Sequence, residues 1–274
     1  MHKNILITVS LISLFSSGTI DTFNGAYHGT DALESYETSW GKERFVKEDY
    51  LRYFPHYEEY SEKIPYVDIA SINLAHLPAP YSSLNKLQIF NNYGMYFNSK
   101  YIAQLLKHNV IENVVEIGSY FGLSTRHIAS LLPAHGKLYA IDSWAYFDGM
   151  YEQFLSNIVW KGLHNKVVPI KQLSQQALPE LLSHCKTFDL IYVDGDHETD
   201  GVLRDLEMYM PLLSEKGVIC GDDWLIRTVR NAVEIFAQKY ELTIYAACNF
   251  WFLKLEGAYG YKSFLDASDD VWKM

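Results

Sequence analysis

The run VVEIGSYFGLST, residues 114–125, decides the fold of this chain. It begins in an apolar strand predicted over 113–117 and leads into a helix predicted over 123–132. Gly118 and Gly122 allow a tight turn between them, and the N–H groups at the start of the helix would face a ligand. The glycine pair by itself fits close packing of strand and helix equally well, so a second feature is needed.

Glu116 supplies that feature. Its carboxylate stands two residues before Gly118, where it would face the pocket. There it would attract an ammonium group and repel a pyrophosphate. S-adenosylmethionine carries an ammonium group and NAD carries a pyrophosphate, so the sequence favours S-adenosylmethionine.

Short apolar strands alternate with amphipathic helices on both sides of this run, which predicts βαβ units and a mostly parallel sheet. The predicted strands are 113–117, 137–141, 166–170, 188–193, 217–220, 242–247 and 250–255, and the predicted helices are 99–107, 123–132, 146–161, 174–183, 201–213 and 228–240. Only Cys248 and Asn249 join the last two strands, too short a link for a parallel crossover, so the last strand should be antiparallel. We therefore predict a Rossmann-like α/β fold with seven strands, which differs from the all-parallel six strands of dinucleotide dehydrogenases.

Polar residues follow the second and third predicted strands. Asp142 ends the second, at the position where nucleotide-binding folds hydrogen-bond ribose hydroxyls, although a helix cap is the alternative. Ser174 and Gln175 open the helix after the third strand, where adenine would lie. Ser174 is also a favourable N-cap residue, so binding and capping are both open for it.

Carboxylates follow the next two strands, in FDLIYVDGDH (188–197) and GVICGDDW (217–224). Adjacent parallel strands end in one crevice, so Asp194, Asp196, Asp222 and Asp223 should converge. Crowded carboxylates repel one another unless a cation or a proton compensates, and hard oxygen ligands suit Mg²⁺, Ca²⁺ or Mn²⁺. Solvated loop carboxylates would explain any one of them, but explain both clusters poorly.

These runs together resemble the catechol O-methyltransferase-like group of class I S-adenosylmethionine-dependent methyltransferases. The resemblance is strongest to the bacterial branch with an Asp-Gly-Asp-His signature, which includes macrocin-type O-methyltransferases. It covers about 165 residues and extends to the run VRNAV at 229–233. The cofactor-binding residues that it implies, with their neighbours in the same loops, are Glu116, Gly118, Ser119, Tyr120, Gly122, Ser124, Asp142, Ser143, Trp144, Ser174, Gln175 and Asp194.

The resemblance also implies a divalent cation, with Mg²⁺ favoured, held by Asp194, Asp222 and Asp223. His197 stands where the plant and animal enzymes have a catalytic lysine, so it is the predicted general base, with a helix cap or a bond to Asp196 as the alternative. The expected reaction is methylation of a hydroxyl group on a small molecule.

Composition supports a small acceptor. The chain has 274 residues and a formal net charge of −10, which disfavours nucleic acid because its binding relies on Lys and Arg. We expect Tyr93, Tyr96 and Tyr120 to line an apolar pocket for the acceptor. A homodimer is left open.

The N-terminus complicates the compartment. Lys3, the apolar run 5–15 and the small residues 16–18 follow the order of a secretory signal, although a buried strand or helix is an equal alternative. The run is too short to predict a stable membrane span. Export would conflict with the cytosolic supply of S-adenosylmethionine, so localisation is left open.

We divide the chain into a signal-like segment, 1–18, an accessory region, 19–90, the methyltransferase domain, 91–257, and a C-terminal tail, 258–274. Two other functions are considered: an NAD(P)-dependent oxidoreductase, disfavoured by Glu116 and by the missing third glycine of the dinucleotide fingerprint, and a non-catalytic secreted binding protein with the same fold.

Overall fold

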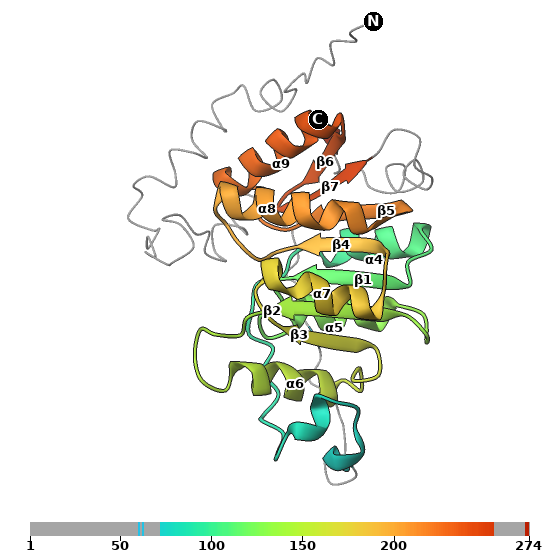
Figure 1. The fold of residues 1–274 in the computed structure, drawn as a ribbon, viewed down its shortest axis with the longest axis vertical. Helices are drawn as coiled ribbons and strands as arrows, with labels where there is room; N and C mark the ends of the chain where they lie inside the picture. Colours follow the sequence, from blue (N-terminus) through green and yellow to red (C-terminus); the bar gives the residue numbers. More distant parts are fainter. Residues whose placement is uncertain (1–59, 61, 63–71, 255–271, 274) are drawn as a thin grey trace, which may run out of the picture.

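The computed structural model describes residues 60, 62, 72–254 and 272–273. Their centre is one eight-stranded sheet with helices on both faces (Figure 1). The predicted signal-like segment and almost all of the region up to residue 71 lie outside the described residues. Among the described helices, none has the length and apolar character needed to cross a bilayer.

The elements follow the predicted alternation of strands and helices. The strands are β1 Asn113–Ile117, β2 Lys137–Asp142, β3 Val167–Lys171, β4 Phe188–Val193, β5 Leu213–Gly221, β6 Thr243–Ala247, β7 Phe250–Lys254 and β8 Trp272–Lys273. The α-helices are α4 Ser99–His108, α5 Leu123–Leu131, α6 Met150–Trp160, α7 Ser174–His184, α8 Thr199–Tyr209 and α9 Arg227–Tyr240. Three short 3₁₀ helices are η2 Leu74–His76, η3 Tyr81–Ser83 and η4 Met210–Leu212.

The strand order is β3-β2-β1-β4-β5-β7-β6-β8. Strands β1 to β5 are parallel to one another, whereas β7 is antiparallel to both β5 and β6. The predicted Rossmann-like sheet with an antiparallel last strand of seven is therefore confirmed. The edge strand β8 was not predicted, because two residues are too few to show a strand period.

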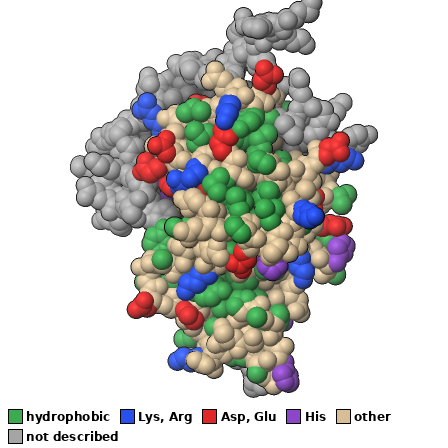
Figure 2. Space-filling model, in the orientation of Figure 1, with side chains coloured by type: hydrophobic (Ala, Val, Ile, Leu, Met, Phe, Trp, Pro, Cys, Tyr) green, Lys and Arg blue, Asp and Glu red, His purple; other side chains and the backbone are tan. Residues whose placement is uncertain are grey.

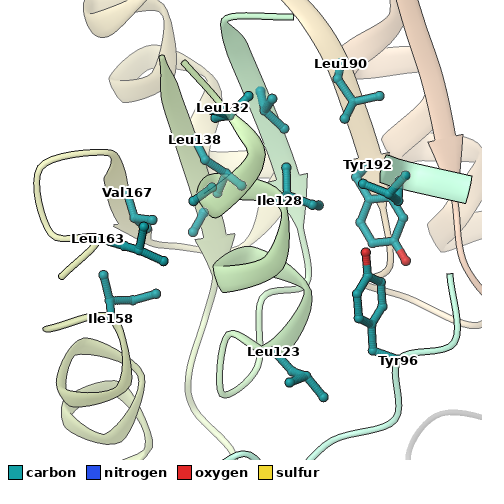
Figure 3. Close-up of a cluster of buried hydrophobic side chains, with 14 of the residues drawn as sticks. Tyr96, Leu123, Ile128, Leu132, Leu138, Ile158, Leu163, Val167, Leu190 and Tyr192 are labelled. Carbon is teal, nitrogen blue, oxygen red and sulfur yellow. The ribbon is translucent and has the colours of Figure 1, made fainter. Parts of the chain in front are cut away.

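Two apolar layers cover the sheet because successive strand residues point to opposite faces. Val114 and Leu190 belong to the layer under α4, α5 and α6, whereas Val115 and Ile191 belong to the layer under α7, α8 and α9. Figure 3 shows part of the first layer, in which Ile128 of α5 lies beside the sheet. Alternation within each strand thus builds both halves of the core.

Helix α6 begins at Met150, four residues later than predicted. The loop before it includes Trp144 and Gly149, which have positive φ angles of 45° and 85° and so cannot continue a right-handed helix. An apolar run such as 143–150 does not reveal these backbone angles. The displaced start leaves a loop at the carboxyl end of β2.

Residues before the predicted domain boundary at 91 also enter the core. Tyr81 is 1% exposed, and its hydroxyl donates to the carbonyl oxygen of Val167 at 2.8 Å. Glu62 accepts a hydrogen bond from Nε of Arg126 at 2.7 Å, and both side chains are buried. Part of the predicted accessory region therefore packs as one unit with the sheet and its helices.

Candidate active site

The turn after β1 is built around the carboxylate of Glu116, which is fully buried. It accepts hydrogen bonds from Oγ of Ser119 at 2.8 Å, from Oγ of Ser124 at 2.6 Å and from Oγ1 of Thr125. Burial raises the pKa of Glu116, and the three hydroxyl donors oppose that rise. The carboxylate therefore joins the strand end to the first turn of α5, a structural role that the sequence did not reveal.

Gly118 brings this turn against the end of β4. Its φ is +87°, and a Cβ at this position would lie 1.9 Å from the carbonyl oxygen of Asp194. Gly122, with φ of +80°, precedes α5, and a Cβ there would approach the ring of Phe154 to 2.9 Å. Both glycines therefore allow a close approach that a larger residue would block.

Asp142 links the turn after β1 to the loop after β2. Its carboxylate accepts from the backbone N–H of Tyr120 at 2.8 Å and from that of Trp144 at 2.7 Å. Ser119 and Ser143 add backbone hydrogen bonds, and together these donors oppose the rise in the pKa of Asp142 that burial causes. Asp142 thus lies at the predicted place, held in orientation by backbone donors from two loops.

Tyr120 and Trp144 both have positive φ angles, 44° and 45°. The indole Nε1 of Trp144 donates to the carbonyl oxygen of Tyr120 at 2.7 Å. Asp223, after β5, shares this unusual backbone conformation at 63°. Such angles are uncommon outside glycine and concentrate at functional sites, and here they follow the carboxyl ends of β1, β2 and β5.

Ser174 and Gln175 begin α7 as predicted, but Ser174 does not cap it. Leu173 is the N-cap residue, and Oγ of Ser174 donates instead to Oδ1 of Asp205 on α8 at 2.6 Å. With its amide oxygen turned toward Arg204, Gln175 accepts from Nη2 of that residue at 3.0 Å. Contacts with α8 therefore fix both side chains.

The ends of β4 and β5 bring together Asp194, His197 and Asp223, whose ligand atoms all lie within 4.8 Å of one another. Nε2 of His197 is 2.5 Å from Oδ2 of Asp223. Burial, together with the charges of Asp222 and Asp223, raises the pKa of Asp194 well above its usual range. A compensating cation would relieve this repulsion, and the oxygen-rich donor set suits a hard divalent ion.

Asp222 lies beside this group but faces a different set of partners. Its Oδ1 accepts from the backbone N–H of Asp223 at 2.7 Å and from Nδ2 of Asn249 at 2.5 Å. Burial and the charge of Asp223 raise the pKa of Asp222 to about 8. Of the three predicted metal ligands, Asp194 and Asp223 therefore lie in this group with His197 as its third member, whereas Asp222 lies outside it.

His197 is not the N-cap residue of α8, one of the two structural alternatives considered for it. Helix α8 begins at Thr199 after Glu198, and Oδ1 of Asp196 accepts from the backbone N–H of Glu198 at 2.9 Å. Burial disfavours the charged imidazole, but the carboxylates of Asp223, Asp222 and Asp196 outweigh it and raise the pKa of His197. The imidazole thus faces the carboxylates of the β5 end.

The prediction that Tyr96 lines the acceptor pocket is wrong. Tyr96 is 1% exposed, and its hydroxyl lies 3.0 Å from Nδ1 of His127 in the core. Figure 3 shows its hydroxyl directed toward that of Tyr192. Tyr93 is 62% exposed, and its ring centroid lies 6.3 Å from that of Tyr120. The sequence could not distinguish the buried Tyr96 from the exposed Tyr93, because the burial of each ring depends on how α5 packs against the sheet.

Comparisons with known proteins agree with this geometry. Residues 115–224 match the family model described as a methyltransferase domain. Over 128 aligned residues the chain is 30% identical to catechol O-methyltransferase B of Danio rerio. The alignment covers 45% of this chain and 46% of the relative. The chain thus matches less than half the length of this curated relative.

Two solved structures share the fold. An O-methyltransferase from Streptomyces achromogenes involved in tomaymycin synthesis, in complex with S-adenosylmethionine, aligns with a TM-score of 0.50 at 17% identity, covering 76% of this chain and 98% of its own. A caffeoyl-CoA O-methyltransferase homologue from Staphylococcus aureus aligns with a TM-score of 0.50 at 18% identity, covering 64% and 89%.

The sheet order and the turn after β1 define a Rossmann-like class I methyltransferase fold. Residues 115–224 are thus similar to a methyltransferase domain, and the relative matched by sequence is an O-methyltransferase.

Proposed function

We propose that this protein is a divalent-cation-dependent O-methyltransferase that transfers the methyl group of S-adenosylmethionine to a hydroxyl group of a small molecule. The observation that carries the proposal is the convergence of Asp194, Asp223 and His197 beside the Gly118 turn. Carboxylates and a basic side chain lie there next to the loop in which a class I fold binds its cofactor.

The chain offers complementary groups for each part of S-adenosylmethionine. Asp142 presents a carboxylate for ribose hydroxyls, and backbone donors already hold it in orientation. The carboxylate of Glu116, beside the Gly118 turn, would supply the negative charge that attracts the ammonium group of S-adenosylmethionine. Ser174 and Gln175, held by α8, would flank the adenine.

Asp194, Asp222 and Asp223 would hold the cation, with Asp196 outside their group. A bound Mg²⁺ or Mn²⁺ would supply Lewis-acid chemistry that lowers the pKa of the acceptor hydroxyl. His197 would accept the hydroxyl proton as the oxygen–carbon bond forms and the sulfur–carbon bond breaks, leaving a methyl ether and S-adenosylhomocysteine. The carboxylate of Asp223 would orient the imidazole and stabilise its charged form.

A small acceptor is supported by charge. The net charge of −10 works against the phosphate contacts of nucleic acid. On the face in Figure 2, the Lys and Arg side chains of the described residues are interspersed with Asp and Glu and do not gather into one basic patch. The rings of Tyr93 and Tyr120 offer apolar surface next to the cofactor turn. A sugar or a catechol-like ring fits this combination.

Calorimetry of the purified protein with S-adenosylmethionine, S-adenosylhomocysteine and NAD tests the cofactor. We expect the first two to bind and NAD not to bind. Transfer of labelled methyl groups to a panel of catechols and sugars, with a chelator and then with Mg²⁺ or Mn²⁺, tests the reaction. Binding of NAD alone would favour an oxidoreductase, and the absence of any cofactor binding would favour a non-catalytic binding protein.

A further inference from the structure

The tip of the β6–β7 hairpin contacts both aspartates at the end of β5. Asn249 is 2% exposed, and its Nδ2 lies 2.5 Å from Oδ1 of Asp222 and 3.0 Å from Oδ1 of Asp223. Its Oδ1 accepts from the backbone N–H of Leu225 at 3.2 Å, and its backbone oxygen accepts from that of Trp224 at 3.0 Å. One residue thus attaches the hairpin to the loop that carries two predicted metal ligands.

A second buried amide reaches Asp222 from another part of the chain. Asn98, directly before α4, is fully buried and hydrogen-bonds the carboxylate of Asp222. Its Nδ2 also lies 3.2 Å from the hydroxyl oxygen of Tyr192 on β4. Two neutral amides from elements outside the matched region 115–224 therefore meet at one carboxylate.

The chemistry of an amide suits this position. An amide N–H donates to a carboxylate and orients it, yet adds no positive charge that would replace a cation. Both contacts of Asn249 are to Oδ1 atoms, whereas His197 contacts Oδ2 of Asp223. The amide of Asn249 therefore holds the Oδ1 atoms of the two aspartates, and the imidazole of His197 contacts the other oxygen of Asp223.

We propose that Asn249 and Asn98 are positioning residues that hold Asp222 and Asp223 in the orientation needed to bind the divalent cation. This inference rests on the proposed metal-dependent function. Partners that orient metal ligands commonly contribute 10- to 100-fold to metal affinity, roughly the effect we expect for Asn249.

The test is titration of the metal-stripped full chain with Mn²⁺, following free Mn²⁺ by electron paramagnetic resonance. Asn249→Ala should weaken Mn²⁺ binding by about 10- to 100-fold and leave the affinity for S-adenosylhomocysteine within about twofold of the parent. Asn98→Ala should weaken Mn²⁺ binding in the same direction, and it carries the test if Asn249→Ala does not fold.

Trp251→Phe is the matched control. It lies in the same hairpin and loses the hydrogen bond from Nε1 to the backbone oxygen of Asp222, at 2.7 Å, together with part of a buried ring. We expect lower thermal stability with Mn²⁺ affinity close to that of the parent. Unchanged Mn²⁺ affinity in the folded Asn variants, or an equal loss of Mn²⁺ affinity in Trp251→Phe, would overturn the positioning role of the two asparagines. The proposed metal-dependent function would not be affected by either result. A parent protein that binds no Mn²⁺ would overturn the metal-dependent function as well.

Discussion

Gly118 and Asp194 lie in direct backbone contact, although they are 76 positions apart in the sequence. A Cβ on Gly118 would lie 1.9 Å from the carbonyl oxygen of Asp194, closer than any real contact. The backbone N–H of Asp194 in turn donates to the carbonyl oxygen of Ile117 at 2.8 Å. The cofactor turn and the carboxylate cluster are therefore parts of one rigid arrangement.

Gly118→Ala should lower the free energy of unfolding by about 3 kcal/mol or more and abolish cofactor binding, because backbone atoms must move to admit the methyl group. Chemical denaturation and calorimetry with S-adenosylhomocysteine measure both effects. Gly162→Ala is the control, since Gly162 also has a positive φ of 66° but has no heavy atom within 4 Å of an added Cβ. It should cost only about 1 kcal/mol. Equal losses in the two variants would exclude the close approach as the cause.

Glu116→Gln should weaken S-adenosylmethionine binding at least tenfold with little change in stability. The amide keeps the shape of the side chain, and the hydroxyls of Ser119, Ser124 and Thr125 can rotate to suit it, so mainly the charge is lost. Glu116→Ala should lower stability as well, because three buried hydroxyls lose their acceptor. Calorimetry and thermal unfolding separate the two effects. If Gln binds the cofactor as tightly as Glu, the charge has no role in binding.

Glu62→Gln should lower the free energy of unfolding by about 3–5 kcal/mol, because Arg126 would remain as a buried charge without its carboxylate. Glu207→Gln provides the comparison, since Glu207 pairs with the exposed Lys239 and its loss should change stability little. Urea denaturation of both variants measures the difference. A small effect at Glu62 would mean that the contact between residue 62 and α5 contributes little to the fold.

Asp205→Asn should change how stability depends on pH. Burial raises the pKa of Asp205 to about 6, against the opposing hydrogen bond from Ser174. The folded state therefore binds this proton more tightly than the unfolded chain does. The resulting stabilisation is complete below the unfolded pKa near 4 and is lost as the pH rises through about 6.

At pH 7 the Asn variant should accordingly be more stable than the parent by roughly 2–3 kcal/mol, at about 1.4 kcal/mol per pKa unit, and at pH 4 the two should be similar. Denaturant titrations between pH 4 and pH 8 measure this difference. A difference that does not depend on pH would contradict the raised pKa.

His197→Ala should lower turnover by about 100-fold or more on an identified acceptor, while S-adenosylmethionine affinity stays nearly constant. The remaining activity should rise with pH, because the acceptor hydroxyl must then ionise without a base. Rates measured between pH 6 and pH 9 test both statements. His76→Ala removes an exposed histidine that is distant from His197 in the sequence, so its turnover should equal that of the parent. A variant at 197 that turns over like the parent at every pH would assign the imidazole a structural role.

The sequence alone determined the order and type of the elements and the strand ends at which chemistry is expected. Apolar strands such as Asn113–Ile117 and Phe188–Val193 were predicted with their observed bounds, because alternation and helical periodicity are local properties of a chain. The two-residue link at 248–249 likewise predicted the antiparallel β7, since chain length limits the connection. Asp142, Asp194 and Asp223 could be placed at one edge because each follows a parallel strand, and the carboxyl ends of such strands lie at the same edge of the sheet.

The tertiary structure decided what each of these side chains contacts. Glu116 accepts hydrogen bonds from three hydroxyl groups, and Ser174 donates to Asp205 instead of capping its helix. Asn249 contacts Asp222 and Asp223 from a hairpin that looked like a simple turn in the sequence. Each contact joins residues brought together by a turn or by packing of separate elements. No local pattern encodes them, because a buried polar group must find its partner wherever the packed elements place one.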